Sequence, residues 1–119
     1  DLIYEDSNGE IVLADFKTSN GPYASKFPPK DAPIDTKTRK ALISGAFKAK
    51  KTRLQLAAYK LAAEHCLGIK ISKTQIIVTT ALEQFSTQVF TFGGKVIEKD
   101  EKKWMELVAE YYDKQTVVA

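Results

Sequence analysis

The segment Ile11–Ser19, with the sequence IVLADFKTS, is an apolar run that ends in a carboxylate and an ammonium two residues apart. Its bulky apolar residues predict a buried β-strand. Side chains point alternately to the two faces of a strand, so Asp15 and Lys17 share one face and Phe16 points to the other. A charge at the edge of an apolar layer is costly unless it is paired. We therefore predict that this strand delivers a metal ligand and a catalytic lysine to an active site.

A hairpin is predicted just upstream of this strand. Asp1 to Glu5 alternates weakly between apolar and polar residues, and DSNG at residues 6–9 contains the Asn-Gly pair typical of a hairpin turn. In an antiparallel hairpin, the start of the first strand lies beside the end of the second. We therefore expect Asp1 to lie close to Asp15, so that two carboxylates and Lys17 converge at one end of the sheet.

The rest of the sequence predicts a long loop, a helix, two strands and a final helix. Residues 19–51 contain all four prolines and are predicted to form a loop that holds at most a short helix, from Thr36 to about Phe47. Further elements are predicted at Thr52–Leu67 (helix, with Gly68 as its stop), Thr74–Leu82 and Thr87–Phe92 (strands) and about Lys99 to Lys114 (helix). This order predicts an α+β fold with α/β character, in which helices flank a mixed central sheet that begins with the hairpin.

Composition limits the class of protein. A chain of 119 residues is large enough for one domain with its own core. A single cysteine, Cys66, excludes disulfide frameworks, cysteine-ligated zinc sites and four-cysteine iron–sulfur clusters. No apolar run approaches the roughly 20 residues of a membrane helix, so we expect a soluble, intracellular protein. Because the chain begins inside a strand-like pattern at Asp1, without a methionine, we expect it to be a fragment of a longer protein.

The positive charge is unevenly distributed. Residues 22–53 contain nine Lys or Arg and two Asp, a local charge of +7, which leaves 3 − 7 = −4 for the remainder. A basic segment on an acidic body is typical of a polyanion contact, and a long loop is often functional. The alternative is a solvated basic surface. The nucleic-acid contacts predicted from this segment are Lys37, Arg39, Lys40, Lys48, Lys50, Lys51 and Arg53.

The chemistry expected of the hairpin end is phosphodiester hydrolysis. Hard divalent cations such as Mg²⁺ prefer oxygen ligands, and Asp1, Asp15 and the backbone carbonyl of Phe16 could supply three. A bound divalent cation activates water and polarises a phosphate. Lys17 would orient the attacking water or neutralise charge that develops on the phosphate. The alternative for Asp15 and Lys17 is a surface ion pair worth about 0–1 kcal/mol.

Three segments carry a family resemblance: DLI at residues 1–3, DFKTS at 15–19 and QLAAY at 55–59. They resemble the RecB-like branch of the PD-(D/E)XK nucleases, whose pattern is Asp, a hairpin, Asp-aromatic-Lys-Thr and a downstream Gln-x-x-x-Tyr. The likeness is greatest to mitochondrial genome maintenance exonucleases and related phage exonucleases. It extends to the strand Ile76–Thr80 and the final Trp-bearing helix, and thus covers nearly the whole chain except the basic insert.

The resemblance implies a restriction-endonuclease-like core and Mg²⁺- or Mn²⁺-dependent cleavage of single-stranded DNA from its ends. Asp1 and Asp15 would be the metal ligands, Lys17 the catalytic lysine, and Gln55 and Tyr59 the helix residues that position the DNA strand and the site. It also implies a bacterial, phage-infected or mitochondrial setting.

The family often places an acidic residue on a helix upstream of the first Asp, and this chain begins at that Asp. We therefore expect a single nuclease core domain over residues 1–119 that lacks an N-terminal helical part. Two alternatives stay open: a nuclease-fold fragment that binds DNA without cutting it, and a structure-specific or restriction-type endonuclease.

Overall fold

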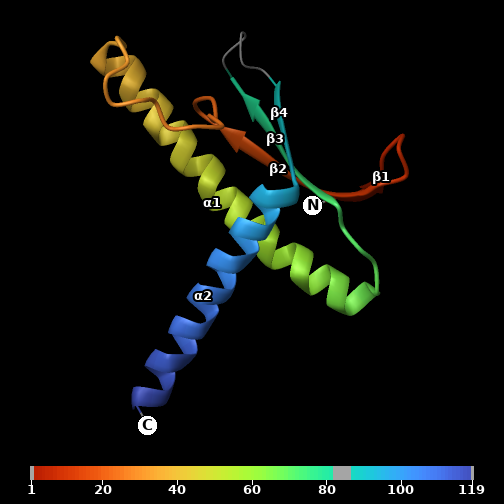
Figure 1. Ribbon diagram of the computed structural model, residues 1–119. Coiled ribbons are helices and arrows are strands. Elements are labelled where there is room, and N and C mark those ends of the chain that lie inside the picture. Colours follow the sequence, from red (N-terminus) through yellow and green to blue (C-terminus); the bar gives the residue numbers. More distant parts are fainter. Residues whose placement is uncertain (1, 82–86, 119) are drawn as a thin grey trace.

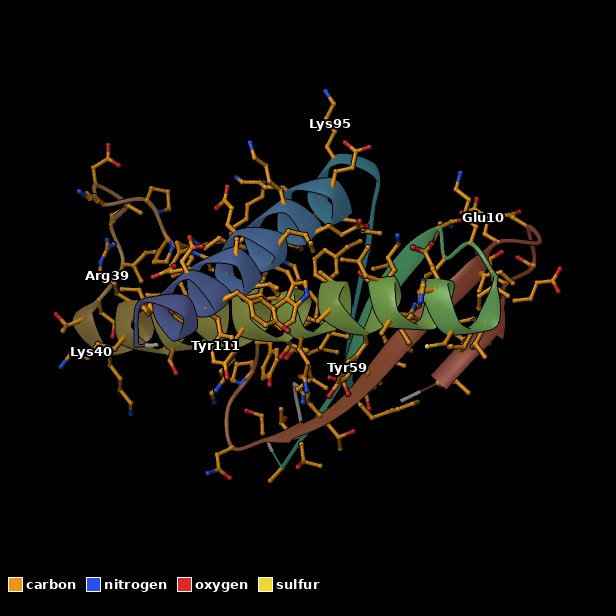
Figure 2. All side chains as sticks on the ribbon, turned by 90° about the horizontal axis from the view of Figure 1, so that it is seen from below. Glu10, Arg39, Lys40, Tyr59, Lys95 and Tyr111 are labelled. Carbon is orange, nitrogen blue, oxygen red and sulfur yellow. The ribbon has the colours of Figure 1, made fainter. Side chains whose placement is uncertain are left out.

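The computed structural model of the chain describes residues 2–81 and 87–118, and the side chains of residues 2–81 and 87–114. The elements are β1 (Leu2–Glu5), β2 (Ile11–Ser19), α1 (Thr36–Leu67), β3 (Lys73–Thr80), β4 (Thr87–Gly93) and α2 (Gly94–Val118). Helix α1 lies against the sheet, and α2 crosses α1 before its C-terminal end extends away from the sheet (Figure 1). Seen from below, α2 lies over α1 on the side away from the strands (Figure 2).

The four strands form one mixed sheet in the order β1-β2-β3-β4. β1 pairs with β2 in the predicted antiparallel hairpin, β2 pairs with β3 in parallel, and β3 pairs with β4 antiparallel. Parallel neighbours need a long crossover connection, and α1 provides it between β2 and β3. The predicted α+β class, with a mixed sheet and an N-terminal hairpin, is confirmed.

The core lies between α1 and one face of the sheet. Alternate residues of the two central strands point into it, including Leu13 from β2 and Ile76 and Val78 from β3. Helix α1 contributes Ala49 and Leu56. The face that carries Leu13 continues along β2 to the charged end of the strand, so the apolar core leads directly to the candidate site.

The prediction for residues 36–51 is correct in part: a helix begins at Thr36, as expected, but the loop predicted for residues 48–51 is wrong. Helix α1 begins at Thr36 and continues without a break to Leu67, a length of 32 residues. Gly45 lies inside this helix, although glycine weakens a helix interior by roughly 0.5–1 kcal/mol relative to alanine. Here the packing requires glycine, since a Cβ atom at Gly45 would lie 2.6 Å from the carbonyl oxygen of Pro22.

Other boundaries agree more closely with the sequence. Helix α1 stops at Gly68, as predicted, where the glycine adopts φ 66° and its N–H donates to the Glu64 carbonyl. Strand β3 runs to Thr80, and the end predicted for it at Leu82 lies outside the described residues. Helix α2 begins at Gly94, about a turn and a half before the expected Lys99. Within the described residues, neither helix has an apolar stretch long enough to cross a membrane.

The connection between β2 and α1 is held on both sides. The backbone N–H of Tyr23 donates to Gln88 Oε1 at 2.8 Å, and Gln88 Nε2 donates back to the Tyr23 carbonyl at 3.1 Å. The Tyr23 side chain is buried in the core. Farther on, Arg39 donates to the carbonyls of Pro29 and Ala32. This loop is therefore tied to β4 at one end and to α1 at the other.

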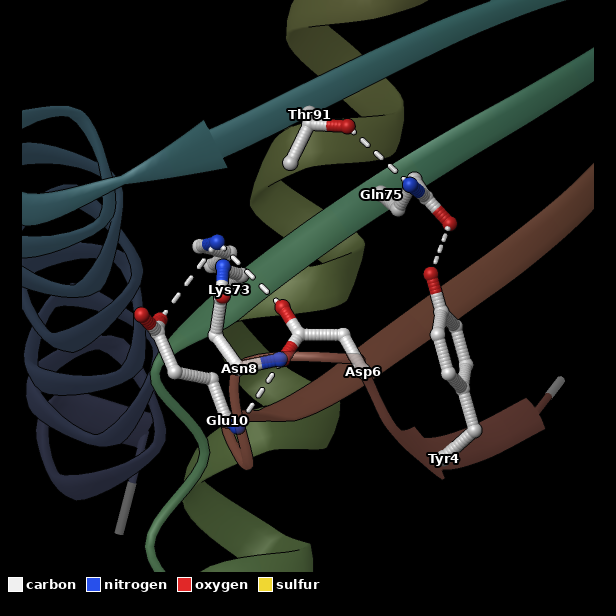
Figure 3. Close-up of polar contacts among 7 residues, drawn as sticks. All are labelled: Tyr4, Asp6, Asn8, Glu10, Lys73, Gln75 and Thr91. Atoms are coloured by element: carbon white, nitrogen blue, oxygen red, sulfur yellow. Dashed lines mark hydrogen bonds and ion pairs between the residues drawn. The ribbon is translucent and has the colours of Figure 1, made fainter.

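The turn of the hairpin is fixed by a charged cluster (Figure 3). Asp6 Oδ1 accepts the backbone N–H groups of Asn8 and Glu10, each at 2.9 Å, and Asp6 Oδ2 lies 3.3 Å from Lys73 Nζ. The hydrogen bonds from Glu10 and Asn8, with the charge of Lys73, hold the pKa of Asp6 below its ordinary value. The hydrogen bond with Asp6 and the charge of Glu10 raise the pKa of Lys73.

A second contact ties β1 across the sheet on the face opposite α1. The Tyr4 hydroxyl donates to Gln75 Oε1 at 2.8 Å, and Gln75 Nε2 donates to Thr91 Oγ1 at 3.0 Å (Figure 3). These three residues lie on β1, β3 and β4. The hydrogen bonds therefore hold the short edge strand in register with the rest of the sheet.

Candidate active site

Asp15 and Lys17 lie side by side at the end of the buried half of β2. Asp15 is 4% exposed, and Lys17 Nζ lies 3.2 Å from Asp15 Oδ2. Phe16, between them, points to the opposite face and is 55% exposed. The alternation of the strand therefore places the two charged side chains on the face that packs against α1.

Helix α1 adds the two residues of the Gln-x-x-x-Tyr segment. Lys17 Nζ donates a hydrogen bond to Gln55 Oε1 at 3.2 Å, and Gln55 Nε2 donates to the Tyr59 hydroxyl oxygen at 3.0 Å. Residues four apart share one face of a helix, which places both side chains over the end of β2. Tyr59 is 41% exposed, and Figure 2 shows it on the side of α1 that faces β2. Four of the predicted site residues thus form one connected chain: Asp15, Lys17, Gln55 and Tyr59.

One oxygen of Asp15 is left without a hydrogen bond. Asp15 Oδ2 is buried and accepts none among the described residues, although Lys17 Nζ lies within ion-pair distance of it. The ammonium is therefore close to this oxygen but lies outside the directions in which it could donate. A buried carboxylate oxygen is normally satisfied by donors or by a cation. Asp15 thus fits the role of a ligand to a hard cation.

The other proposed ligands are only partly described. Asp1 lies outside the described residues; Leu2, which follows it, pairs with Ala14, the neighbour of Asp15. Phe16 lies beyond the last described pair between β1 and β2. Across residues 2–81 and 87–118, no group of three Asp, Glu, His or Cys residues lies close enough to enclose a metal ion. The described residues therefore supply one carboxylate ligand to this site.

A large cavity opens beside these four connected residues. It has a volume of about 760 Å³ and lies where β2 and β3 end next to α1. Its lining includes Lys17 and Gln55 of the four connected residues, together with Lys48 and Lys51 from the preceding turns of α1. Ligands of α/β sheets commonly bind at the carboxyl ends of parallel strands, and this cavity occupies such a position.

The predicted basic contacts are divided between the two sides of α1. Lys48 and Lys51 face the cavity together with Gln55, because positions three and four apart share a helix face. Lys50 lines a groove next to α2, and Lys51 reaches that groove as well as the cavity. Arg53 also faces α2, where its Nε lies 3.3 Å from Asp100 Oδ2.

The charge of Arg53 is balanced inside the fold. Its guanidinium carbon lies 5.5 Å from the centre of the Phe92 ring, in addition to the ion pair with Asp100. Burial raises the pKa of Asp100, and the nearby charge of Arg53 opposes that shift. The placement of Arg53 therefore indicates a contact between helices rather than a cation presented to the cavity.

The remaining basic residues lie near the N-terminal end of α1. Arg39 donates to two loop carbonyls, and Lys40 is exposed beside it (Figure 2). Lys37 lines a separate hollow together with Tyr23 and Leu42. Arg39 therefore holds the connection between β2 and α1, and the structure does not bring these three residues together with Lys17.

Ser19 is one of several cavity residues that lie outside the predicted set of site residues. Lys48 Nζ donates to Ser19 Oγ at 3.1 Å, which joins β2 to α1 next to the candidate site. The signal in the sequence is the alternation of side chains along the strand, which places Ser19 on the same face as Asp15 and Lys17. The contact with Lys48 has no signal in the local sequence, which predicts Lys48 in a loop rather than on a helix.

Comparison with protein-family models finds no match, and comparison with curated proteins finds no similar sequence.

Proposed function

We propose that this chain is a metal-dependent deoxyribonuclease of the PD-(D/E)XK superfamily, RecB-like branch, and that it degrades single-stranded DNA from its ends. The observation that carries the proposal is a set of four side chains that contact one another in sequence, Asp15, Lys17, Gln55 and Tyr59, at the rim of a basic cavity. The mixed sheet with a helical crossover is compatible with a restriction-endonuclease-like core, which is part of the proposal.

Asp15 is the proposed ligand to Mg²⁺ or Mn²⁺, with Asp1 and the carbonyl of Phe16 as further ligands. A divalent cation bound there would supply a more acidic water and polarise the phosphate. Lys17 is proposed to orient the attacking water or to neutralise charge on the phosphate. Gln55 holds Lys17 through its amide oxygen, and Tyr59 holds the amide of Gln55.

Burial argues against a merely structural ion pair. Exposed Lys–Asp pairs contribute about 0–1 kcal/mol and need no special environment. Asp15 is instead almost fully buried, yet one of its oxygens accepts no hydrogen bond among the described residues. Such an arrangement does not optimise stability, since a buried ion pair stabilises a fold only when its remaining lone pairs are satisfied.

The test is degradation of an end-labelled single-stranded oligonucleotide with Mg²⁺ or Mn²⁺. We expect the wild-type chain to shorten the oligonucleotide, EDTA to stop the reaction, and Lys17→Ala to abolish it. Lys95→Ala is the matched control, because Lys95 is an exposed lysine on α2, far from Tyr59 in Figure 2. Full activity of Lys17→Ala would refute the proposed role of this lysine.

A second candidate function is DNA binding without cleavage. It is favoured by the cavity-facing lysines Lys48 and Lys51 and by the single described carboxylate at the site. It predicts retardation of the oligonucleotide in a gel with no products in any divalent metal. Cutting of closed circular DNA would instead indicate the third candidate, an endonuclease.

A further inference from the structure

We propose that Ser19, Lys48 and Lys51 form a subsite for the DNA phosphate next to the one that is cut. The inference rests on the proposed function, because it takes Lys17 to mark the position of the scissile phosphate. It assigns to the cavity one chemical class of ligand, the phosphodiester backbone of a single strand.

The first argument is the hydrogen bonding of Ser19. Its Oγ accepts Lys48 Nζ at 3.1 Å and the backbone N–H of Gly21 at 3.4 Å. A hydroxyl oxygen has two acceptor lone pairs and one hydrogen to donate. Both acceptor positions are thus used, and the remaining capacity of Ser19 is as a donor toward the cavity that it lines.

The second argument is charge. An ammonium has three donors and no acceptor, and the bond to Ser19 uses one donor of Lys48. No carboxylate in the described part of the chain forms an ion pair with Lys48 or Lys51, whereas Lys17 is paired with Asp15. The described lining of the cavity contains three lysines and no Asp or Glu. A ligand rich in acceptor oxygens and negatively charged complements this surface.

The third argument is spacing. Ser19 follows Lys17 by two residues on the same strand, which corresponds to about 6.6 Å. This distance is comparable to the separation of successive phosphates in an extended nucleic-acid strand. The cavity, at about 760 Å³, lies within the roughly 300–1,000 Å³ of sites that enclose small ligands, and has room for a nucleotide. One phosphate at Lys17 and the next at Ser19 therefore fit the geometry.

The test is binding of a fluorescent single-stranded oligonucleotide in EDTA, where no cleavage occurs, measured by anisotropy over a range of salt concentrations. Each phosphate contact in a single strand contributes about 0.7 to the slope of log affinity against log salt. We expect Lys48→Gln to weaken binding and reduce the slope by about 0.7. Lys48→Arg should keep the slope, and Lys95→Gln, far from the cavity, should match the wild type.

With metal present, the same variants separate binding from chemistry. Lys48→Gln should raise KM with little change in kcat, because a neighbouring phosphate is held equally before and during the reaction. Ser19→Ala should raise KM in the same way. Each variant's thermal unfolding midpoint is compared with that of the wild type, and Lys48→Arg keeps the test valid if Lys48→Gln unfolds.

The outcomes distinguish this inference from the proposed function. Loss of slope in Lys48→Gln without cleavage by the wild type would support a phosphate contact at Lys48 but would refute the nuclease, and with it the position of this contact next to a cut phosphate. Cleavage by the wild type with unchanged slope and KM in Lys48→Gln would overturn the subsite alone, as would absence of oligonucleotide binding. Displacement of the oligonucleotide by an equimolar nucleoside monophosphate would indicate a pocket for free nucleotides and would also overturn it.

Discussion

A methyl group added at Gly45 should destabilise the protein, although alanine is the better helix former. The new Cβ would lie 2.6 Å from the Pro22 carbonyl oxygen, 3.1 Å from the Ala24 nitrogen and 3.2 Å from the Tyr23 carbonyl carbon. All three atoms belong to the backbone, and Tyr23 is also held by Gln88, so they cannot rotate away as a side chain would.

The magnitude follows from two opposing terms. Overpacking costs typically 1–3 kcal/mol, and contact with fixed backbone belongs in the upper part of that range. The intrinsic preference of a helix for alanine over glycine offsets about 1 kcal/mol of this cost. We therefore expect Gly45→Ala to lower the free energy of unfolding by roughly 1–2 kcal/mol.

The assay is urea unfolding followed by circular dichroism. With an m-value of about 1.5 kcal/mol/M, the midpoint should fall by roughly 0.7–1.3 M. Gly21→Ala is the matched control, because a Cβ at Gly21 meets no atom within 4 Å. That variant should be unchanged or slightly more stable, through restriction of the unfolded chain. A Gly45→Ala protein at least as stable as the wild type would refute the close packing of the loop against α1.

Three further predictions concern the site and the ion pairs. Gln55→Ala should lower kcat about 10–100-fold with little change in KM, because Lys17 loses the hydrogen bond to the Gln55 amide oxygen. Tyr59→Phe should lower kcat less, because Tyr59 contacts only the amide nitrogen of Gln55. Equal kcat values in Gln55→Ala and the wild type would contradict the positioning role. Lys60 is buried, and despite the opposing effect of burial its hydrogen bonds to Glu101 (2.9 Å) and Glu64 (3.1 Å) raise its pKa above 10.5. The ion pairs of Lys60 therefore contribute fully to stability below about pH 10, and this contribution is lost as the pH rises through the raised pKa. Lys60→Met should lower the free energy of unfolding by roughly 1–3 kcal/mol at pH 7. In urea titrations at increasing pH, the variant should lack the loss of stability that the wild type shows at alkaline pH. The lowered pKa of Asp6 implies stability that is present above about pH 4 and lost as the pH falls through the lowered value, so thermal melts of Asp6→Asn should show a shallower acid decline than those of the wild type.

The candidate site shows how far local sequence determines geometry. The period of two along β2 sufficed to place Asp15 and Lys17 on one face, and the Asn-Gly turn sufficed to predict the hairpin. Because Gln55 and Tyr59 are four residues apart, helix geometry likewise places their side chains on one face. These relations involve neighbours a few residues apart, so tertiary packing has little room to change them.

Contacts between distant segments could not be predicted in this way. The bond between Lys48 and Ser19 depends on α1 continuing through residues 48–51, which the sequence predicts as a loop. The assignment of Arg53 to α2 depends on where that helix crosses α1. A count of basic residues along the chain contains neither fact.

Local sequence accounts for the type and order of most strands and helices and for the pairing of Asp15 with Lys17, because backbone alternation and helix period act over one or two turns. That position 45 requires glycine follows only from the packing, since the reason is a backbone carbonyl from Pro22, 23 residues away in the chain. Only packing likewise decided that Asp15 is buried with one oxygen accepting no hydrogen bond among the described residues. Burial is a property of the assembled layers, and it turned an ordinary Asp-x-Lys segment into a candidate site.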